Sequence, residues 1–328
     1  MTASKGAQDT PNARVDPAVL GPVAEAAYEL PAPVACTWIR RGFNDHYLLD
    51  TPTGKYVLRL YLNHKYWISG ADDFRFELEL LRFLHQEGVA VAPPVPRRDG
   101  ELLGTVDTPA GPRHYALFAF AEGALCGPLT APQARTLGQT LARFHLVADA
   151  FRPSHPTYRR YDLDLRYLLD QPVELLEAFL RQQGRGGLGR YRPRLAELRQ
   201  RVLALPRDGE RYGLIHGDPH RGNAAVAAAG EVTLIDFDHG GFGWRAYDVA
   251  VCCRNLPPAV QRAALVGYEE VRQLSAAERA LFPTFNLLRS IWDWGDVLAM
   301  RAAWGPDEPL GASFADHVEE GLREMFEP

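Results

Sequence analysis

Short runs of apolar residues alternate with polar turns between residues 35 and 61 of the chain. The apolar runs are residues 35–39, 47–49 and 56–61, and the turns between them contain Gly, Asn, Asp, Thr and Pro. Runs of this length bounded by such residues are typical of β-strands joined by tight connections. Two further runs, residues 101–105 and 114–120, follow a Pro-rich turn. The pattern predicts a five-stranded antiparallel sheet in the first third of the chain.

A helical pattern separates the third and fourth predicted strands. Asp72 or Asp73 is a suitable N-cap, and Gly88 stands where a glycine would end the helix after Glu87. Glu77 shares one helix face with three leucines at the spacing i, i+3, i+4 and i+7. A carboxylate is therefore expected on the buried face of this helix.

Beyond residue 123 the chain reads as helical except for one compact segment. Helices are predicted for residues 131–147, 163–183 and 192–205, and strands return between residues 214 and 238. More helices are expected from there to the C-terminus. A sheet with one helix followed by a mostly helical half indicates an α+β fold.

The change of pattern near residues 120–123 predicts two lobes. The N-terminal lobe would span residues 14–121 and the C-terminal lobe residues 122–328, sizes that fit two domains with cores of their own. Residues 1–13 are small and polar without apolar periodicity, so a mobile tail is expected there.

Composition narrows the function classes. A formal net charge of -5 argues against a nucleic-acid binder, which needs a basic face. No stretch approaches about 18 uncharged apolar residues, and the N-terminus lacks the pattern of a secretory leader, so a cytoplasmic protein without membrane contact is expected. Oligomeric state is left open. The cysteines have no C-x-x-C spacing and are expected to be reduced packing residues: Cys36, Cys126, Cys252 and Cys253.

The segment from His216 to Asn223 carries the strongest chemical signal. An apolar lead-in ends in His216-Gly217-Asp218, and four residues separate Asp218 from Asn223. The same spacing occurs in the kinase catalytic loop H-R-D-x-x-x-x-N, where the Asp accepts the proton of a substrate hydroxyl and the Asn binds Mg²⁺. Asp218 is therefore the candidate catalytic base and Asn223 a candidate metal ligand.

A second acidic motif, Asp236-Phe237-Asp238, follows thirteen residues after Asn223. Residues 224–228 and 231–235 can pair as a hairpin across residues 229–230, which would return Asp236 to Asn223. Mg²⁺ favours such hard oxygen ligands, with phosphate and water completing its shell. Asp236 is therefore the second candidate metal ligand.

The two motifs together resemble those of the superfamily that contains aminoglycoside phosphotransferases, choline kinases and type II homoserine kinases. That superfamily is similar to protein kinases in fold and reads H-G-D where protein kinases read H-R-D. Residues 76–84 resemble the branch that includes stress-response kinase A. The resemblance implies transfer of the γ-phosphate of ATP to a hydroxyl group with Mg²⁺ as cofactor. It also implies that Asp238 supports the metal or the loop and that Asp248 braces the loop.

The N-terminal half holds the candidate nucleotide-binding residues. Arg59 stands where the comparable kinase strand carries a phosphate-gripping Lys, and an ion pair between Arg59 and Glu77 is expected, the alternative being a Glu that bends out to water. Asn44 lies in the turn that would cover the phosphates, although this turn contains one glycine and also reads as an ordinary hairpin. Phe118 and Phe120 lie on the connector expected beside adenine.

His216 is expected to act as a hydrogen-bonding strut, because Asp218 already supplies a proton acceptor. Its i, i+4 relation to His220 does not indicate zinc, because that spacing needs a helix, and Gly217 and Pro219 favour a loop.

The acceptor site is expected on the C-terminal helices. Trp292, Asp293, Trp294 and Asp296 combine aromatic faces with carboxylates, which suits an acceptor with a cationic amine. Ordinary amphipathic packing is the alternative for this set.

Three functions stay open from the sequence. The first is a kinase of a small molecule bearing a hydroxyl, such as an amino alcohol, amino acid, sugar or aminoglycoside. The second is a Ser/Thr protein kinase similar to stress-response kinase A. The third is a pseudokinase that binds nucleotide without turnover, against which Asp218, Asn223 and Asp236 argue and for which Arg59 and the glycine-poor turn argue.

Overall fold

The computed structural model describes residues 12–125, 127–304 and 310–327. Most of the predicted tail lies outside these residues, as does Cys126. The tail was also predicted to include Asn12, but this side chain is 1% exposed and donates hydrogen bonds to the carbonyls of Asn63 and Ala303. The prediction is wrong at that residue, because one amide links two segments that are far apart in the sequence.

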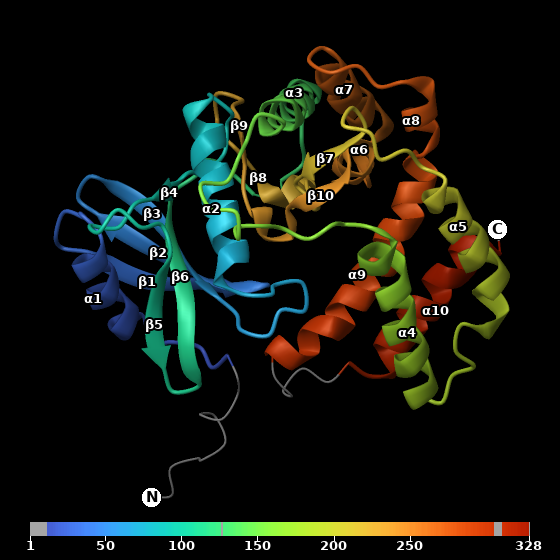
Figure 1. The fold of residues 1–328 in the computed structure, drawn as a ribbon, viewed down its shortest axis with the longest axis horizontal. Coiled ribbons are helices and arrows are strands. Elements are labelled where there is room, and N and C mark those ends of the chain that lie inside the picture. The colour runs from blue at the N-terminus through green and yellow to red at the C-terminus, as the bar shows by residue number, and fades with distance from the viewer. Residues whose placement is uncertain (1–11, 126, 305–309, 328) are drawn as a thin grey trace, which may run out of the picture.

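The N-terminal part contains an antiparallel sheet in the order β1-β2-β3-β6-β4, with β5 paired to β6 (Figure 1). Five strands occur in the predicted regions, although the fourth, predicted for residues 101–105, is shifted to Gly104–Thr108. A sixth, β4, contains two residues including Pro94 and lies at an edge, where a missing N–H is tolerated. The predicted count was therefore one short. The strands are β1 (Ala35–Arg41), β2 (Asn44–Thr51), β3 (Gly54–Tyr61), β4 (Pro94–Val95), β5 (Gly104–Thr108) and β6 (Gly111–Ala119).

A helix that the sequence pattern did not predict, α1 (Pro17–Ala27), packs on the outer side of this sheet (Figure 1). Asp16 caps it by accepting from the Ala18 N–H at 2.9 Å. Gly21 and Pro22 weaken its helical signal. Burial of Leu20, Ala24 and Tyr28 against the sheet compensates for that weakness.

The predicted helix after the third strand is α2 (Ala71–Gln86), with its leucine face and Glu77 buried as expected. Gly88 follows it with φ +78°. The predicted cap, Asp72 or Asp73, is wrong by two or three residues, because Gly70 is the N-cap residue. Asp73 instead lies inside the first turn and accepts from the N–H groups of Ser69 and Gly70 at 2.9 and 3.1 Å.

Helices make up most of the C-terminal part (Figure 1). The helix predicted over residues 163–183 is divided, with a π-helical turn at Arg166–Asp170 before α4. Pro172 has no backbone N–H, so it cannot donate the α-helical hydrogen bond that would join α4 regularly to the preceding turn. The helices are α3 (Ala131–Ala148), α4 (Gln171–Gln182), α5 (Arg192–Leu203), α6 (Arg245–Cys253), α7 (Pro258–Glu269), α8 (Ala276–Ala280), α9 (Phe282–Trp304) and α10 (Ala312–Phe326).

Two small antiparallel pairs lie among these helices. The hairpin of β8 (Ala224–Val226) and β9 (Val232–Leu234) is present as predicted, but its register differs by one residue. Ala224 lies opposite Leu234 rather than residue 235, because the turn takes residues 228–230 rather than 229–230. Strand β7 (Tyr212–Ile215) pairs with β10 (Gly241–Trp244). The loop from His216 to Asn223 therefore follows β7, and the segment from Asp236 to Asp238 follows β9.

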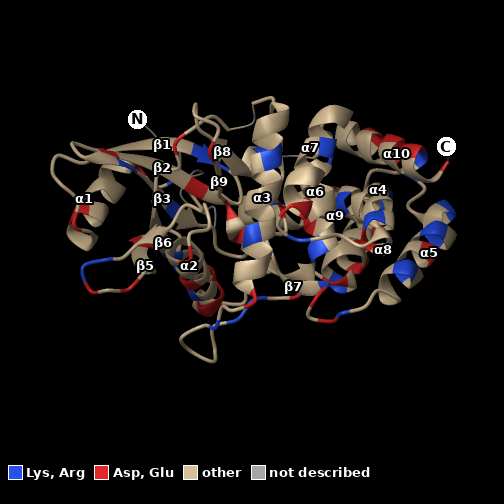
Figure 2. Ribbon diagram, turned by 90° about the horizontal axis from the view of Figure 1, so that it is seen from above, with Lys and Arg blue, Asp and Glu red and all other residues tan. Residues whose placement is uncertain are grey.

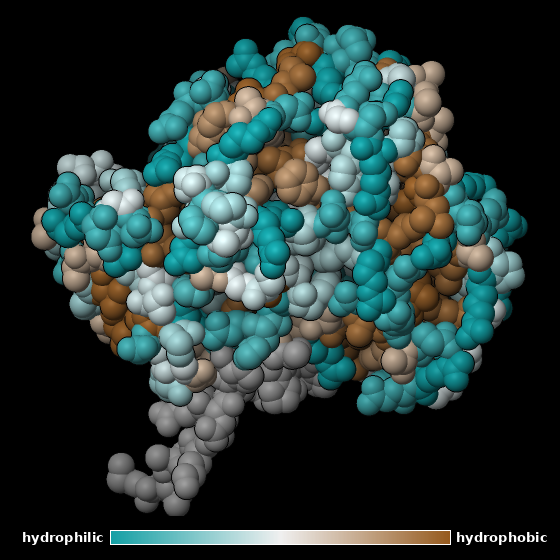
Figure 3. Space-filling model, viewed as in Figure 1, coloured by the Kyte–Doolittle hydropathy of each residue, from teal (hydrophilic) through white to brown (hydrophobic). Residues whose placement is uncertain are grey.

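One apolar core runs from α2 and the end of β6 into α3 and the β8–β9 hairpin. The division into lobes at residue 121 stays a prediction. Acidic and basic residues are interspersed over the ribbon (Figure 2), and on the face drawn in Figure 3 apolar residues show as patches among hydrophilic ones. Among the described residues, no helix is long and apolar enough to cross a bilayer.

Candidate active site

The loop after β7 is held in place by Asp248 of α6. Its carboxylate accepts from the His216 N–H at 2.6 Å and from the Gly217 N–H at 2.9 Å. Gly217 has φ +79°, and a Cβ there would lie 2.2 Å from the carbonyl oxygen of His239. Only glycine fits this position. The bracing contact expected of Asp248 is therefore present.

Asp218 lies at the turn of this loop and is 6% exposed. Asn223 Nδ2 donates to the Asp218 carbonyl at 2.9 Å and to its Oδ2 at 3.2 Å. Arg289 of α9 places Nη1 2.8 Å from Asp218 Oδ1. Burial alone would raise the pKa of Asp218, but the charges of Arg289 and His220 outweigh burial and hold the pKa below its usual range. The carboxylate is therefore ionised at neutral pH.

The imidazole of His216 joins the two motif-bearing segments. Its Nε2 lies 3.0 Å from the Ile235 carbonyl oxygen, and its Nδ1 accepts from the Asp218 N–H at 3.3 Å. These contacts are those of the predicted strut. His220 precedes a short 3₁₀ turn and accepts from the Gly222 N–H, so the two histidines lie on a loop as expected.

The β8–β9 hairpin returns the chain to Asn223, whose carbonyl accepts from the Ile235 N–H at 2.9 Å. Asp236 follows directly and has φ 64° and ψ 62°. A left-handed conformation is uncommon for a residue with a Cβ, although Asp adopts it more readily than most, and such residues cluster at functional sites. The hairpin thus places residues 223 and 236 close together in the fold, as the spacing predicted.

Glu77 is bound by two arginines from different parts of the chain. Arg59 Nη1 lies 2.8 Å from Glu77 Oε1, which is the expected ion pair, while Arg59 Nη2 lies 3.3 Å from Asp236 Oδ1. Arg160 was not predicted. Its Nη2 lies 3.3 Å from Glu77 Oε2 and donates to the carbonyls of Phe237 and Asp238 at 2.9 and 2.8 Å. The carboxylate of Glu77 is therefore linked to the sheet through Arg59. It is also linked to the segment from Asp236 to Asp238 through Arg59 and Arg160.

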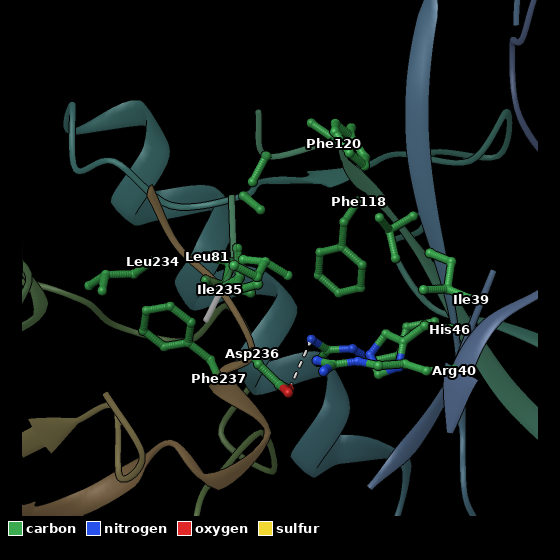
Figure 4. A pocket seen from close by; sticks show the side chains of 16 residues that line it. Ile39, Arg40, His46, Leu81, Phe118, Phe120, Leu234, Ile235, Asp236 and Phe237 are labelled. Carbon is green, nitrogen blue, oxygen red and sulfur yellow. Dashed lines mark hydrogen bonds and ion pairs between the residues drawn. The ribbon is translucent and has the colours of Figure 1, made fainter. Parts of the chain in front are cut away.

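A cavity of about 300 Å³ lies between the sheet, α2 and the segment before Asp236 (Figure 4). One end is apolar and includes Phe118 and Phe120 as expected, together with Leu234 and Ile235. The other end is polar. The residues there are Arg40, His46, Arg59 and Asp236.

Asn44 does not line this cavity and is fully buried behind it. Its Oδ1 accepts from Lys65 Nζ at 2.9 Å, and Lys65 Nζ also lies 2.6 and 2.9 Å from the two oxygens of Asp238. Burial alone would raise the pKa of Asp238, but the charge of Lys65 holds it below its usual range. Sequence reasoning missed Lys65, because a single Lys after a strand has no motif to mark it.

The four acceptor candidates on α9 do not point the same way. Asp293 pairs with Arg254 and Arg289, and Asp296 accepts from the Tyr66 hydroxyl at 2.9 Å. Burial raises the pKa of Asp296 well above its usual range. The ring of Trp292 lies 4.9 Å from that of His239, centre to centre.

Trp294 lies apart from this group. It packs against Gly321 and His317 of α10. Side chains two residues apart on a helix lie on opposite faces, which separates Trp294 from Trp292. The structure thus brings Trp292, Asp293 and Asp296 near the loop with Asp218 and leaves Trp294 in the helical core.

Two protein sequences illustrate the relationships of this chain. An uncharacterised protein of Deinococcus radiodurans is 34% identical over 320 residues, which covers 95% of this chain and 89% of that protein. A homoserine kinase of Neisseria meningitidis is 30% identical over 284 residues, covering 82% of this chain and 84% of the kinase.

Solved structures show the same fold. An amicoumacin kinase in complex with AMP-PNP, Ca²⁺ and Ami superposes with a TM-score of 0.77 at 20% identity, covering 96% of this chain and 94% of the kinase. A microcompartment-associated aminopropanol kinase gives 0.75 at 24% identity, covering 94% and 95%. The family model APH, described as the phosphotransferase enzyme family, matches residues 39–282. The chain belongs to this phosphotransferase enzyme family and is a kinase.

Proposed function

We propose that this kinase transfers the γ-phosphate of ATP to the hydroxyl of a small acceptor that also carries an amine. The observation that supports this most directly is the arrangement around Asp218. Asn223 contacts its carboxylate, and the hairpin brings Asp236 back beside Asn223 at the mouth of an amphipathic cavity. A base, two oxygen ligands and a nucleotide-sized cavity are the parts that phosphoryl transfer requires.

ATP would bind with its base at the apolar end of the cavity and its phosphates at the polar end. Phe118 and Phe120 offer the base aromatic surface, while Arg59 faces the phosphates from between Glu77 and Asp236. The predicted division at residue 121 would lie at the back of this cavity. An AMP-PNP complex of the amicoumacin kinase, which has the same fold, is consistent with nucleotide use.

The donor set suits a magnesium ion. Asn223 uses Nδ2 for its two contacts with Asp218, which leaves Oδ1 without a donor among the described residues. Asp236 accepts from Arg59 through Oδ1 alone. One carboxylate and one amide oxygen are the usual protein share of a Mg²⁺ site completed by phosphates and water. When bound, the ion would neutralise charge on the phosphates.

Asp218 would accept the proton of the acceptor. The hydroxyl oxygen forms a bond to the γ-phosphorus while the bond from that phosphorus to the β–γ bridging oxygen breaks, and ADP leaves. Because Asp218 is ionised, its carboxylate can take the hydroxyl proton during this step. Asn223 and Arg289 orient the carboxylate.

The acceptor would lie between Asp218 and α9. Asp296 accepts from the Tyr66 hydroxyl at 2.9 Å, and burial raises the pKa of its carboxyl. An ammonium group bound beside Asp296 would offset that rise and pair with the ionised form. Homoserine and aminopropanol, the substrates in the names of two related kinases, both join a hydroxyl to an amine. An amino alcohol or hydroxy amino acid is therefore the proposed acceptor class.

A transfer screen tests this function. The purified chain would be incubated with γ-labelled ATP, Mg²⁺ and separate pools of amino alcohols, hydroxy amino acids, sugars, aminoglycosides and peptides. Labelled product is expected from an amine-bearing pool and should disappear on chelation of Mg²⁺. Label in the peptide pool alone would point to a protein kinase instead, and no label in any pool would contradict the proposal.

A further inference from the structure

The turn between β1 and β2 offers little backbone to a phosphate. It contains a single glycine, Gly42, whose N–H donates to the Asn44 carbonyl at 2.9 Å within the turn. Its carbonyl accepts from Trp304 Nε1 at 2.9 Å, so α9 holds the turn as well. Glycine-rich turns bind phosphates through free amide groups, and here that amide is already used. The phosphates of a nucleotide must therefore find other donors.

A row of three basic side chains lies at the polar end of the cavity. In the antiparallel register, His46 of β2 stands opposite Arg40 of β1 on one side and Arg59 of β3 on the other. Directly opposed residues place their side chains on the same face of a sheet. All three line the cavity.

A β-bulge explains how Arg40 enters this row. The register of β1 against β2 shifts between Trp38 and Arg40. A bulge redirects side chains, which is why both Ile39 and Arg40 line the same cavity although they are adjacent. Figure 4 shows Arg40 and His46 together at the end near Asp236, away from Phe120.

Two members of the row have polar groups without protein partners. Arg40 is exposed and forms no ion pair with any residue that the structure describes. His46 is 9% exposed, and its buried Nδ1 has no hydrogen-bond partner. Burial, together with the charge of Arg59, lowers the pKa of His46 to about 4, so the ring is neutral at neutral pH and can donate one N–H. Because His46 also lines the cavity, this ring nitrogen is available to a ligand bound there.

We propose that Arg40 and His46 bind the phosphates of the nucleoside triphosphate, with side chains taking the place of a glycine-rich turn. The inference rests on the proposed function and assigns its phosphate site. Arg59 is paired with Glu77 and Asp236, which offset part of its positive charge. Arg40 supplies additional positive charge for the phosphates. Affinity should therefore depend on the phosphate chain and on salt.

Titrations of the full chain with AMP-PNP, ADP and adenosine in the presence of Mg²⁺ test this assignment. The variants are Arg40→Ala and His46→Asn, with Arg98→Ala and His85→Asn as controls that make the same changes at exposed positions outside the cavity. A charge-assisted hydrogen bond is worth enough that Arg40→Ala should raise the Kd for AMP-PNP about tenfold or more. Adenosine binding should change less than about twofold, and both controls should match the wild type.

Arg40→Ala should also flatten the dependence of AMP-PNP affinity on KCl concentration, since an exposed cation is removed. Because this measurement uses Arg40→Ala alone, it tests the assignment even if His46→Asn does not fold. Wild-type affinity for AMP-PNP in Arg40→Ala, or an equal loss of adenosine binding, would overturn the assignment and leave the proposed function intact. Failure of the wild type to bind AMP-PNP would overturn both.

Discussion

Replacing Lys65 by methionine is expected to destabilise the fold by about 3–5 kcal/mol. Lys65 Nζ lies within 2.9 Å of both oxygens of Asp238, and the two side chains are 0% and 1% exposed. Methionine keeps most of the unbranched side chain, one heavy atom shorter, and removes its charge. Asp238 would then be a buried carboxylate without its cation, a change that costs about 3–5 kcal/mol. Asn44 would also lose its donor.

Urea unfolding followed by tryptophan fluorescence measures this loss. At a slope of about 3 kcal/mol per M, the midpoint of Lys65→Met should fall by about 1 M or more. Lys55→Met is the matched control, because Lys55 is exposed on β3, and its midpoint should stay near that of the wild type.

A second substitution separates charge from packing. Asp238→Asn in the Lys65→Met background removes the unpaired charge and should recover part of the lost stability. A Lys65→Met midpoint equal to that of the wild type, or a double variant no more stable than Lys65→Met, would refute the reasoning that an ion pair holds these segments together.

Three other predictions concern the same region. Asp236→Ala should weaken binding of Mg²⁺-ATP about tenfold or more with little effect on metal-free ATP, measured by calorimetry with and without EDTA; equal affinities in both conditions would argue against a ligand role. Arg160→Met should lower stability by about 2–4 kcal/mol in urea, because it removes one cation from buried Glu77, whereas Arg160→Lys should restore part of that loss; an unchanged midpoint would contradict this. Burial lowers the pKa of both His46 and His239 to about 4, below about 6.5 in the unfolded chain. The unfolded state therefore binds the extra protons, and stability should fall as pH drops from about 6.5 to about 4, by about 1.4 kcal/mol per pH unit for each ring. In His46→Asn the dependence of stability on pH should lose the contribution of one ring. An unchanged dependence in that variant would contradict the prediction.

Local spacing was sufficient to predict the parts of the site that lie on one segment. Asp218 and Asn223 share a loop, and the hairpin that returns Asp236 is set by a short turn ending in Gly230 between two apolar runs. The pair of Arg59 and Glu77 was also predictable, because strand and helix periodicity each fixed the face of one partner. Patterns of this kind depend on neighbours in the sequence.

Residues that reach the site from afar could not be predicted in this way. Arg289 contacts Asp218 from 71 residues away along the chain, and Lys65 contacts Asp238 across 173 residues. Neither has a motif, and each looks like an ordinary surface residue until the fold buries it. Asn44 was assigned to the nucleotide from its place in a turn, but its partner Lys65 draws it behind the cavity.

The fold shows the same limit. Glycine and proline in α1 weakened a helix that tertiary packing nevertheless stabilises, and the two residues of β4 are too few to show a period. Trp294 was grouped with Trp292 by proximity in the sequence, although a helix separates such residues to opposite faces.

Single-turnover transfer by Asp218→Asn tests the central claim most directly. Labelled ATP, Mg²⁺ and the acceptor found in the screen would be mixed with excess enzyme and quenched over time, with Asp99→Asn at an exposed position as the control. Removal of the base should slow phosphate transfer about 10²–10⁴-fold while the Kd for ATP changes less than about threefold. Transfer by Asp218→Asn at the wild-type rate would contradict the account.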